Sequence, residues 1–296
     1  LKGLKPDTKY YYQIIYTKKK SPLKTFTTHS NSKKDHQIVV TSDVQTFGNK
    51  TFRDLVIQKG IIPQITKKHK DLSDGLDFML FPGDLVSSGK TAEWQNFLNA
   101  GNALFSQIPI YPAIGNHDYY SKGENYFRYL VLPGNERYWK KDIGNIRLLS
   151  LDTNKETKKQ VTWLKDILQK TIDDNAIDYL IIEAHHPHQS ESWIKGESKF
   201  SKDVFKMSAE FQGQSGKPVL LLNGHTHAYN RSHHHNHQQY AVIVGGGGGK
   251  LDKWGKFHQV DYSETTVSDD NFGYALLNID AVEKSMTFNW YAYDSK

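Results

Sequence analysis

The chain has 296 residues, enough for one large domain with a sizeable hydrophobic core. It contains no cysteine, which excludes disulfide bonds and thiolate metal sites but favours neither an oxidising nor a reducing compartment. No apolar run reaches the roughly 18 residues that a membrane span requires. The formal net charge of +6 comes from scattered lysines without a regular basic–aromatic pattern, so a phosphorylated small molecule is a better partner than nucleic acid.

The first residues have the pattern of a β-hairpin. Residues 1–28 contain two apparent strands around a Lys-Ser-Pro turn, with alternation through Tyr10, Tyr12 and Ile14. The pattern L-x-P-x-T-x-Y at residues 4–10 resembles the late strands of a fibronectin-III-like sandwich. A two-stranded hairpin is marginal alone, so we expect residues 1–28 to be the C-terminal strands of such a domain, truncated in this chain. The polar residues 29–37 are the expected linker, and residues 38–296 the main domain.

Beyond the linker, the pattern alternates between short apolar runs and amphipathic stretches, which is typical of an α/β domain. Buried strands are expected near 38–43, 77–82, 109–114, 146–151, 178–184 and 218–223. Helices are expected near 51–69, 91–106, 157–171 and 201–212. After residue 227 the pattern turns to strands.

Polar motifs follow most of the apolar runs. They are SDVQ at 42–45, GD at 83–84, GNHD at 115–118, HHP at 185–187 and GHTH at 224–227. Since the carboxyl ends of successive strands meet along one edge of a sheet, these side chains should converge. Glycines before Asp84, Asn116 and His225 would let the backbone approach closely, without a Cβ in the way.

The donor types indicate a metal centre. Carboxylate, amide and imidazole groups without thiolate suit Fe, Mn, Zn or Mg, and one carboxylate can bridge two cations roughly 3.5–4 Å apart. An Asp or Asn at a single strand end is more often a turn former or helix cap. The ordered set of motifs instead favours two metal ions.

The order D-x-Q, GD, GNHD, H-x-P, GHxH resembles the calcineurin-like metallophosphoesterase superfamily, over residues 38 to about 293. The run GHTHAYNRS at 224–232 resembles the purple acid phosphatase branch. The resemblance implies a four-layer α/β/β/α sandwich, preceded here by the fibronectin-III-like remnant. It also implies metal-dependent hydrolysis of phosphate esters, chiefly monoesters, and a secreted or periplasmic location.

The resemblance also implies a role for each matching residue. Asp43 and His227 would bind the first metal, Asp84 would bridge both, and Asn116, His185 and His225 would bind the second. A metal-bound hydroxide would attack phosphorus. His117 would bind no metal but would face the phosphate and protonate the leaving oxygen.

Two positions depart from the templates. Purple acid phosphatases usually have a tyrosine, whose phenolate colours the ferric ion, where this chain has Ser87. Other branches have a histidine ligand where this chain has Gln45, whose amide oxygen, or a water molecule, would fill the place. We therefore expect a colourless protein with Mn, Mg, Zn or divalent Fe in the first site.

Several features around the motifs are open. His186 and His188 either line the phosphate pocket or belong to a solvated loop. KGES at 195–198 resembles an EGE-like stretch, so the 189–200 loop would border the substrate pocket. We expect the histidines at 233–235 and 237 to form a surface tract, and Gly245–Gly249 to be a flexible turn near the rim of the site.

Two alternatives to a phosphomonoesterase are also open. One is a phosphodiesterase acting on nucleotides or phospholipid head groups, because the motifs are shared and the pocket walls decide the substrate. The other is an inactive module that binds a polyanion, which the altered positions 45 and 87 keep open.

Overall fold

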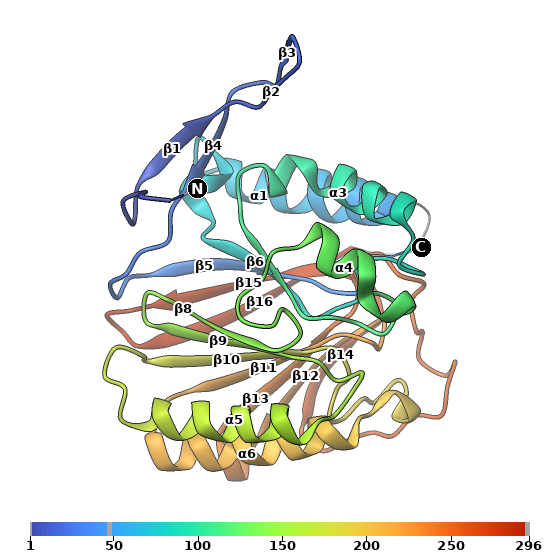
Figure 1. The fold of residues 1–296 in the computed structure, drawn as a ribbon. Helices are drawn as coiled ribbons and strands as arrows, with labels where there is room; N and C mark the ends of the chain where they lie inside the picture. The colour runs from blue at the N-terminus through green and yellow to red at the C-terminus, as the bar shows by residue number, and fades with distance from the viewer. Residues whose placement is uncertain (1, 46–48, 294–296) are drawn as a thin grey trace.

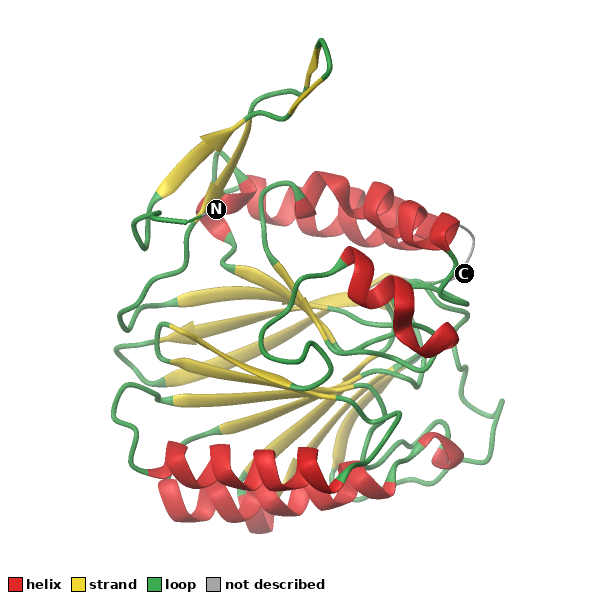
Figure 2. Cartoon of the chain, in the orientation of Figure 1, coloured by secondary structure: helices red, strands yellow, loops and turns green. Residues whose placement is uncertain are grey.

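The computed structural model describes residues 2–45 and 49–293. Two β-sheets pack face to face, and helices cover the outer face of each (Figures 1 and 2). The expected α/β/β/α sandwich is confirmed.

The first sheet has five strands in the order β16-β15-β5-β6-β7. Its three parallel strands are β5 (His36–Val40), β6 (Phe78–Phe81) and β7 (Ile110–Pro112). The antiparallel strands β15 (Phe272–Asp280) and β16 (Ser285–Tyr293) complete it, with Ala275 opposite Val40. The outer face is covered by η2 (Phe52–Ile61), α1 (Ile62–Thr66) and α3 (Thr91–Phe105), and α2 (Leu72–Gly75) precedes β6.

The second sheet has seven strands in the order β14-β12-β13-β11-β10-β9-β8. Its parallel strands are β9 (Ile146–Leu151), β10 (Tyr179–Ala184), β11 (Val219–Asn223) and β13 (Gln239–Val244). Strands β8 (Trp139–Ile143), β12 (Tyr229–His234) and β14 (Thr265–Asp269) are antiparallel to their neighbours. Helices α5 (Lys158–Ile172) and α6 (Lys199–Ser215) cover the outer face, and η3 (Tyr120–Gly123) and α4 (Glu124–Tyr129) follow β7.

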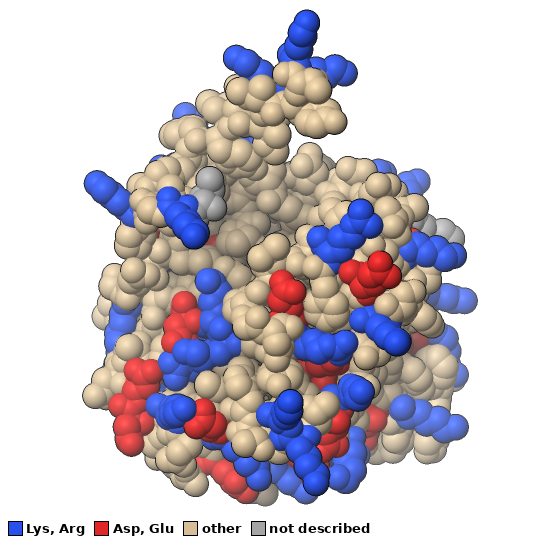
Figure 3. Space-filling view, viewed as in Figure 1, with Lys and Arg blue, Asp and Glu red and all other residues tan. Residues whose placement is uncertain are grey.

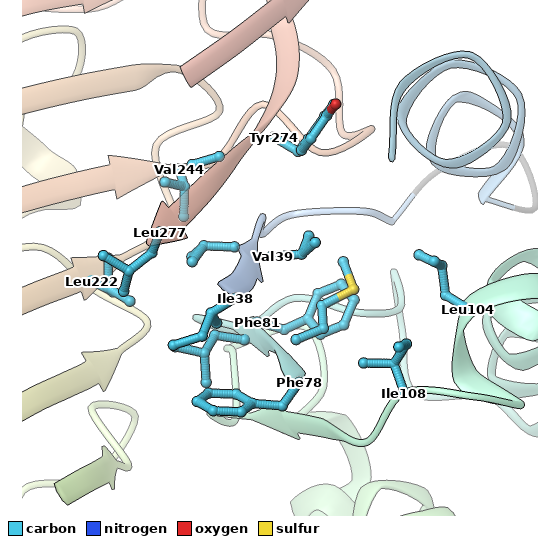
Figure 4. Packing of buried hydrophobic residues seen from close by; sticks show 14 of the residues in the cluster. Ile38, Val39, Phe78, Phe81, Leu104, Ile108, Leu222, Val244, Tyr274 and Leu277 are labelled. Carbon is cyan, nitrogen blue, oxygen red and sulfur yellow. The ribbon is translucent and has the colours of Figure 1, made fainter. Parts of the chain in front are cut away.

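Buried apolar side chains fill the space between the two sheets. Ile38 and Leu277 from the first sheet belong to the same cluster as Leu222 and Val244 from the second (Figure 4). A second cluster joins the seven-stranded sheet to α5 and α6, through residues such as Leu164 and Phe200. Both faces of the parallel strands are thus buried, which explains why these strands are continuous apolar runs in the sequence.

The expected elements match the structure closely, with one change of type. The stretch predicted as a helix at 51–69 forms a ten-residue π-helix, η2, followed by the short α1. A π-helix is rare and differs from an α-helix in hydrogen-bond register, which residue propensities do not distinguish. The strand β8 and the helix α4 were not predicted.

The N-terminal strands project from one end of the sandwich (Figure 1). Strand β1 (Lys9–Tyr12) pairs with β4 (Lys24–Thr27), and the short β2 (Ile15–Tyr16) and β3 (Lys19–Lys20) extend the hairpin. Five of its large apolar side chains are exposed, namely Tyr11, Ile14, Ile15, Tyr16 and Leu23. Strand β5 begins at His36, inside the stretch expected to be a linker.

Charged groups are dispersed over the molecule. Lysines lie at the tip of the projecting hairpin, and acidic and basic groups are interspersed over the rest of the visible face (Figure 3). Among the helices of the described residues, none is both long enough and apolar enough to cross a membrane.

Candidate metal centre

The motif residues lie just beyond the carboxyl ends of parallel strands in both sheets. Asp43 follows β5, and Asp84 and Asn116 follow β6 and β7 of the five-stranded sheet. His185 follows β10, and His225 follows β11 of the seven-stranded sheet. The convergence expected from the sequence is present, and it draws on both sheets.

One group of donor atoms surrounds His185. Its Nε2 lies 3.0 Å from Asn116 Oδ1, 3.2 Å from His225 Nδ1 and 3.3 Å from Asp84 Oδ2. His185, Asn116 and His225 are the residues expected at the second metal, and Asp84 is the expected bridge.

A second group surrounds His227. Its Nε2 lies 3.4 Å from Asp43 Oδ1 and 3.2 Å from Nε2 of Gln45. The same Gln45 atom lies 3.2 Å from Asp84 Oδ2. Asp84 Oδ2 therefore faces both groups, and the Gln45 amide lies beside the first.

Backbone carbonyls orient two of the imidazoles. His185 Nδ1 donates to Pro82 O at 2.9 Å, and His227 Nδ1 donates to Lys250 O at 2.8 Å. When either ring is neutral, its Nε2 lone pair therefore points toward the carboxylates, which is the arrangement of a metal ligand.

The backbone around the centre is strained and closely packed. Asp43, Asp84 and His225 have φ values of 57°, 55° and 70°, a region that residues with side chains rarely adopt. A Cβ on Gly115 would lie 2.1 Å from Asp84 Oδ1, and one on Gly224 would lie 2.2 Å from Ser42 Oγ. The glycines are needed for this close approach, as expected.

Asp118 is a functional residue that the sequence reading did not assign, although it is the last letter of GNHD. Its buried carboxylate accepts hydrogen bonds from the backbone N–H groups of Asp84, Leu85, Val86 and Gly115, at 2.9 to 3.2 Å. These bonds hold the loop with Asp84 against the loop with Asn116.

The electrostatics of the centre fit bound cations. Asp43, Asp84 and His185 are fully buried, with donor atoms within 4.8 Å of one another. Burial lowers the pKa of His185, but Asp84 and then Asp43 outweigh it and raise the pKa to about 9. Burial likewise lowers the pKa of His227, yet Asp43 raises it to about 9. In the absence of metal, protons thus compensate the two buried carboxylates, and cations of higher charge can replace them.

His117 lies at the edge of the centre, where about a third of its side chain is exposed. Its Nδ1 donates to Ser87 O at 2.6 Å, and its Nε2 lies 3.9 Å from Asp84 Oδ2. Its backbone N–H also donates to Asp84 Oδ1 at 2.9 Å. Since Nδ1 is occupied, Nε2 is the atom that can face a substrate.

A family model for calcineurin-like phosphoesterases matches residues 36–229. The chain belongs to this family. Members of this family bind metal ions. The buried group of Asp43, Asp84 and His185 could hold a metal in this chain.

Relatives of this chain include plant purple acid phosphatases. It is 24% identical over 268 residues to "Probable inactive purple acid phosphatase 24" of Arabidopsis thaliana, a match that covers 78% of this chain and 43% of the relative. It is 24% identical over 263 residues to "Purple acid phosphatase 15" of the same plant, covering 78% of this chain and 48% of the relative. The chain spans about half the length of these curated relatives.

Two solved structures have a similar fold. A purple acid phosphatase, PPD1, from yellow lupin (Lupinus luteus) has a TM-score of 0.73 and 19% identity, covering 99% of this chain and 60% of that one. GAP50, described as the anchor in the inner membrane complex of Plasmodium, has a TM-score of 0.58 and 13% identity, covering 89% and 90%.

His186 and His188 of this family member lie in different surroundings. The His186 ring is 4.2 Å from the His225 ring, and its Nδ1 is 2.8 Å from Thr153 Oγ1. Burial, followed by the charge of His185, lowers the pKa of His186 to about 3, so this ring is neutral beside the centre. His188 is buried, stacks on Phe205 of α6 at 4.5 Å and contacts His234, so its side chain turns away from the metal ligands.

The expected surface tract is present in part, since His235 is exposed and His233 half-buried, whereas the expected flexible glycine turn was wrong. His234 is buried rather than part of a surface tract, because alternate side chains of β12 point toward α6. The side chain of His237 lies outside the described residues. The run Gly245–Gly249 is not a loose turn but is buried, with Gly249 N donating to Asp43 O and Gly247 N donating to Ser42 O. A Cβ on Gly249 would lie 2.7 Å from the His227 ring, so this run packs directly against the residues of the centre.

Proposed function

We propose that this phosphoesterase hydrolyses phosphate esters, chiefly monoesters, at a centre that holds two metal ions. The observation that carries the proposal is that Asp84 Oδ2 faces two groups of donors, 3.3 Å from His185 Nε2 and 3.2 Å from Gln45 Nε2. A single oxygen between two groups of ligands is the arrangement that a bridged pair of cations requires.

The ligand sets follow from the two groups. Asp43 and His227 would hold the first ion, with Gln45 turned so that its amide oxygen faces it. This orientation fits the buried Oε1 of Gln45, for which residues 2–45 and 49–293 offer no hydrogen-bond partner. Asn116, His185 and His225 would hold the second ion. The ions would supply Lewis acidity toward the phosphate and would activate water.

The protein groups would then orient and protonate the substrate. His117 Nε2 would donate a hydrogen bond to a phosphate oxygen and a proton to the leaving oxygen. This role requires the imidazolium form, because Nδ1–H is already bound to Ser87 O. The neutral His186 ring, whose Nδ1 is bound to Thr153 Oγ1, would donate the hydrogen on its Nε2 to a phosphate oxygen.

A non-catalytic binding protein is the second candidate. It is favoured by the loss of the usual ligand at position 45 and by two relatives that are named inactive. In this case the residues would bind a phosphorylated or other anionic ligand without turning it over.

We also propose a neighbouring domain and a cellular location for this chain. The projecting strands β1–β4 would belong to a separate β-rich unit of the fibronectin-III-like kind, which their exposed apolar side chains support. A secreted or periplasmic location follows from the same resemblance, and fractionation of the source cells would test it.

The deciding experiment combines metal analysis with an assay on one untagged sample. We expect two metal ions per chain by mass spectrometry, and chelator-sensitive hydrolysis of a chromogenic phosphomonoester in preference to a diester. Asp84→Asn should lose metal and activity together, whereas His117→Ala should keep its metals and lose turnover. Two bound metals without turnover of either ester would support the binding protein, and full activity in His117→Ala would refute the assigned acid.

A further inference from the structure

Four aromatic rings form a continuous stack that starts at the metal centre. The His186 ring lies 4.2 Å from the His225 ring, the Trp193 indole lies 4.9 Å from His225, and Phe257 lies 5.2 Å from Trp193. The last two pairs are nearly parallel, with interplanar angles of 28° and 29°. Lys256 Nζ ends the stack, 4.6 Å from the centre of the Phe257 ring.

Trp193 is tightly held in this stack. It precedes the short helix η4 (Ile194–Gly196), and a Cβ on Gly196 would lie 2.8 Å from the indole and 3.2 Å from His225 Cδ2. The backbone of Gly196 thus closes over the edges of both rings. There is little room for the indole to tilt while His225 stays in place.

The two loops that carry the stack are fastened to each other. Ile194 N donates to His258 O at 3.2 Å, and Val260 N donates to Glu191 O at 3.2 Å. Tyr262 OH donates to Glu197 Oε1 at 2.7 Å. The segment 189–198 and the segment 250–262 therefore support Trp193 and Phe257 as one unit.

From this geometry we infer that Trp193 is a positioning residue for His225. The indole covers one face of the imidazole and fixes the plane of that ring, so that Nδ1 faces His185 Nε2 at 3.2 Å and both atoms would be available to one bound cation. The inference rests on the proposed dinuclear centre. It adds a determinant of affinity for the second metal, in a loop where the GHTH motif gives no indication of one.

The inference has a spectroscopic consequence. Indole emission is sensitive to the electrostatic field of a ring stacked upon it, and a bound cation would polarise the His225 ring. Of the six tryptophans of the chain, Trp193 is stacked on a proposed ligand. Filling the second site should therefore change the fluorescence of Trp193.

The test is a Zn²⁺ titration of metal-free protein, followed by tryptophan fluorescence and by calorimetry. Because the loss of a group that orients a ligand typically weakens metal binding by 10- to 100-fold, we expect Trp193→Ala to bind the second Zn²⁺ about 10-fold more weakly. Trp193→Phe should restore most of this affinity, while the fluorescence change should be absent. The matched control is Trp163→Ala on α5, which removes an indole packed on Tyr138 and should leave both Zn²⁺ affinities unchanged.

The outcomes separate the inference from the proposed function. If the unaltered protein binds two Zn²⁺ ions and both Trp193 variants bind them equally well, Trp193 is not a positioning residue. If Trp193→Ala fails to fold, Trp193→Leu, which fills the space without an aromatic ring to stack, takes its place in this comparison. If the unaltered protein binds no Zn²⁺, Mn²⁺ or Fe²⁺, the proposed dinuclear centre itself is wrong.

Discussion

Asp118 shows how one carboxylate can organise a site without facing a substrate. It accepts four backbone N–H groups from the two loops that carry Asp84 and Asn116. An asparagine can accept through only one oxygen, and its NH₂ group would oppose two of the donors.

We therefore expect Asp118→Asn to lower the free energy of unfolding by about 3 kcal/mol, because buried donors lose their charged acceptor. The variant should also bind metal more weakly. Urea unfolding of the metal-free protein and metal titration would measure both effects. Asp203→Asn is the control, since Asp203 is exposed on α6 beside Lys199 and should change stability by less than about 0.5 kcal/mol.

The two raised histidine pKa values predict a pH dependence of metal binding. With pKa values of about 9, His185 and His227 are protonated at neutral pH in the metal-free protein and must lose those protons to bind a cation. Metal affinity should therefore rise as the pH increases toward 9 and level off above it. Calorimetry in buffers of different ionisation enthalpy should detect protons released on binding; an affinity independent of pH between 6 and 9 would contradict the assignment.

The colour of the protein depends on position 87. A serine has no phenolate to give the charge-transfer band of a ferric–tyrosinate pair, so iron-loaded protein should be colourless. An absorption spectrum of the iron-loaded sample checks this, and a strong visible band would show that another tyrosine binds iron.

At the scale of the elements, replacing either of two helical glycines by alanine should change stability in opposite directions. A Cβ on Gly101 of α3 would lie 1.9 Å from Phe105, whose ring packs 5.1 Å from that of Phe97. Gly213 of α6 has no neighbouring atom within 4 Å of its Cβ position.

Alanine is favoured over glycine in a helix by about 1 kcal/mol, so Gly213→Ala should stabilise the protein by up to that amount. Gly101→Ala should destabilise it by about 1–3 kcal/mol, because Phe105 would be forced out of its packed position. Thermal or urea unfolding of the two variants side by side tests the pair, and equal stabilisation by both would show that Phe105 moves freely.

The helices and strands also show how much of the structure could be predicted from the sequence. The strands that precede Asp43, Asp84 and His185 could be predicted, because each is an apolar run followed by a polar motif. The π-helical register of η2 could not, since it depends on hydrogen-bond geometry. The burial of Gly245–Gly249 was also missed, because glycine occurs equally in flexible turns and in closely packed backbone. The roles inferred for Trp193 and Asp118 depend on contacts with residues distant in the sequence, namely His225 and the loop with Asp84.

For the molecule as a whole, acid stability should depend on His29, to which the sequence assigns no role. It lies between the hairpin and the sandwich, with Nε2 2.8 Å from Tyr111 OH. Burial, followed by the charge of Lys141, lowers its pKa from 6.5 to about 4, while Asp77 acts in the opposite direction.

Between these two pKa values the unfolded chain binds a proton that the folded chain does not. Stability should therefore fall as the pH drops from 6.5 to about 4, by up to about 3 kcal/mol from this residue. Urea unfolding across this range should show a shallower pH dependence for His29→Asn. The same dependence in both proteins would assign the acid sensitivity to other groups.

The position of β15 next to β5 has a consequence for synthesis on the ribosome. Strand β5 is among the first of the sandwich to be made, yet its partner on one side spans Phe272–Asp280. At about 5–20 residues per second, more than ten seconds separate the translation of the two strands. During this interval the β5 edge that precedes Asp43 has no partner, and an unpaired edge invites aggregation. The nascent chain should therefore depend on chaperones until its last strands emerge, and a ribosome stalled before residue 272 should carry an open first sheet and an incomplete support for Asp43.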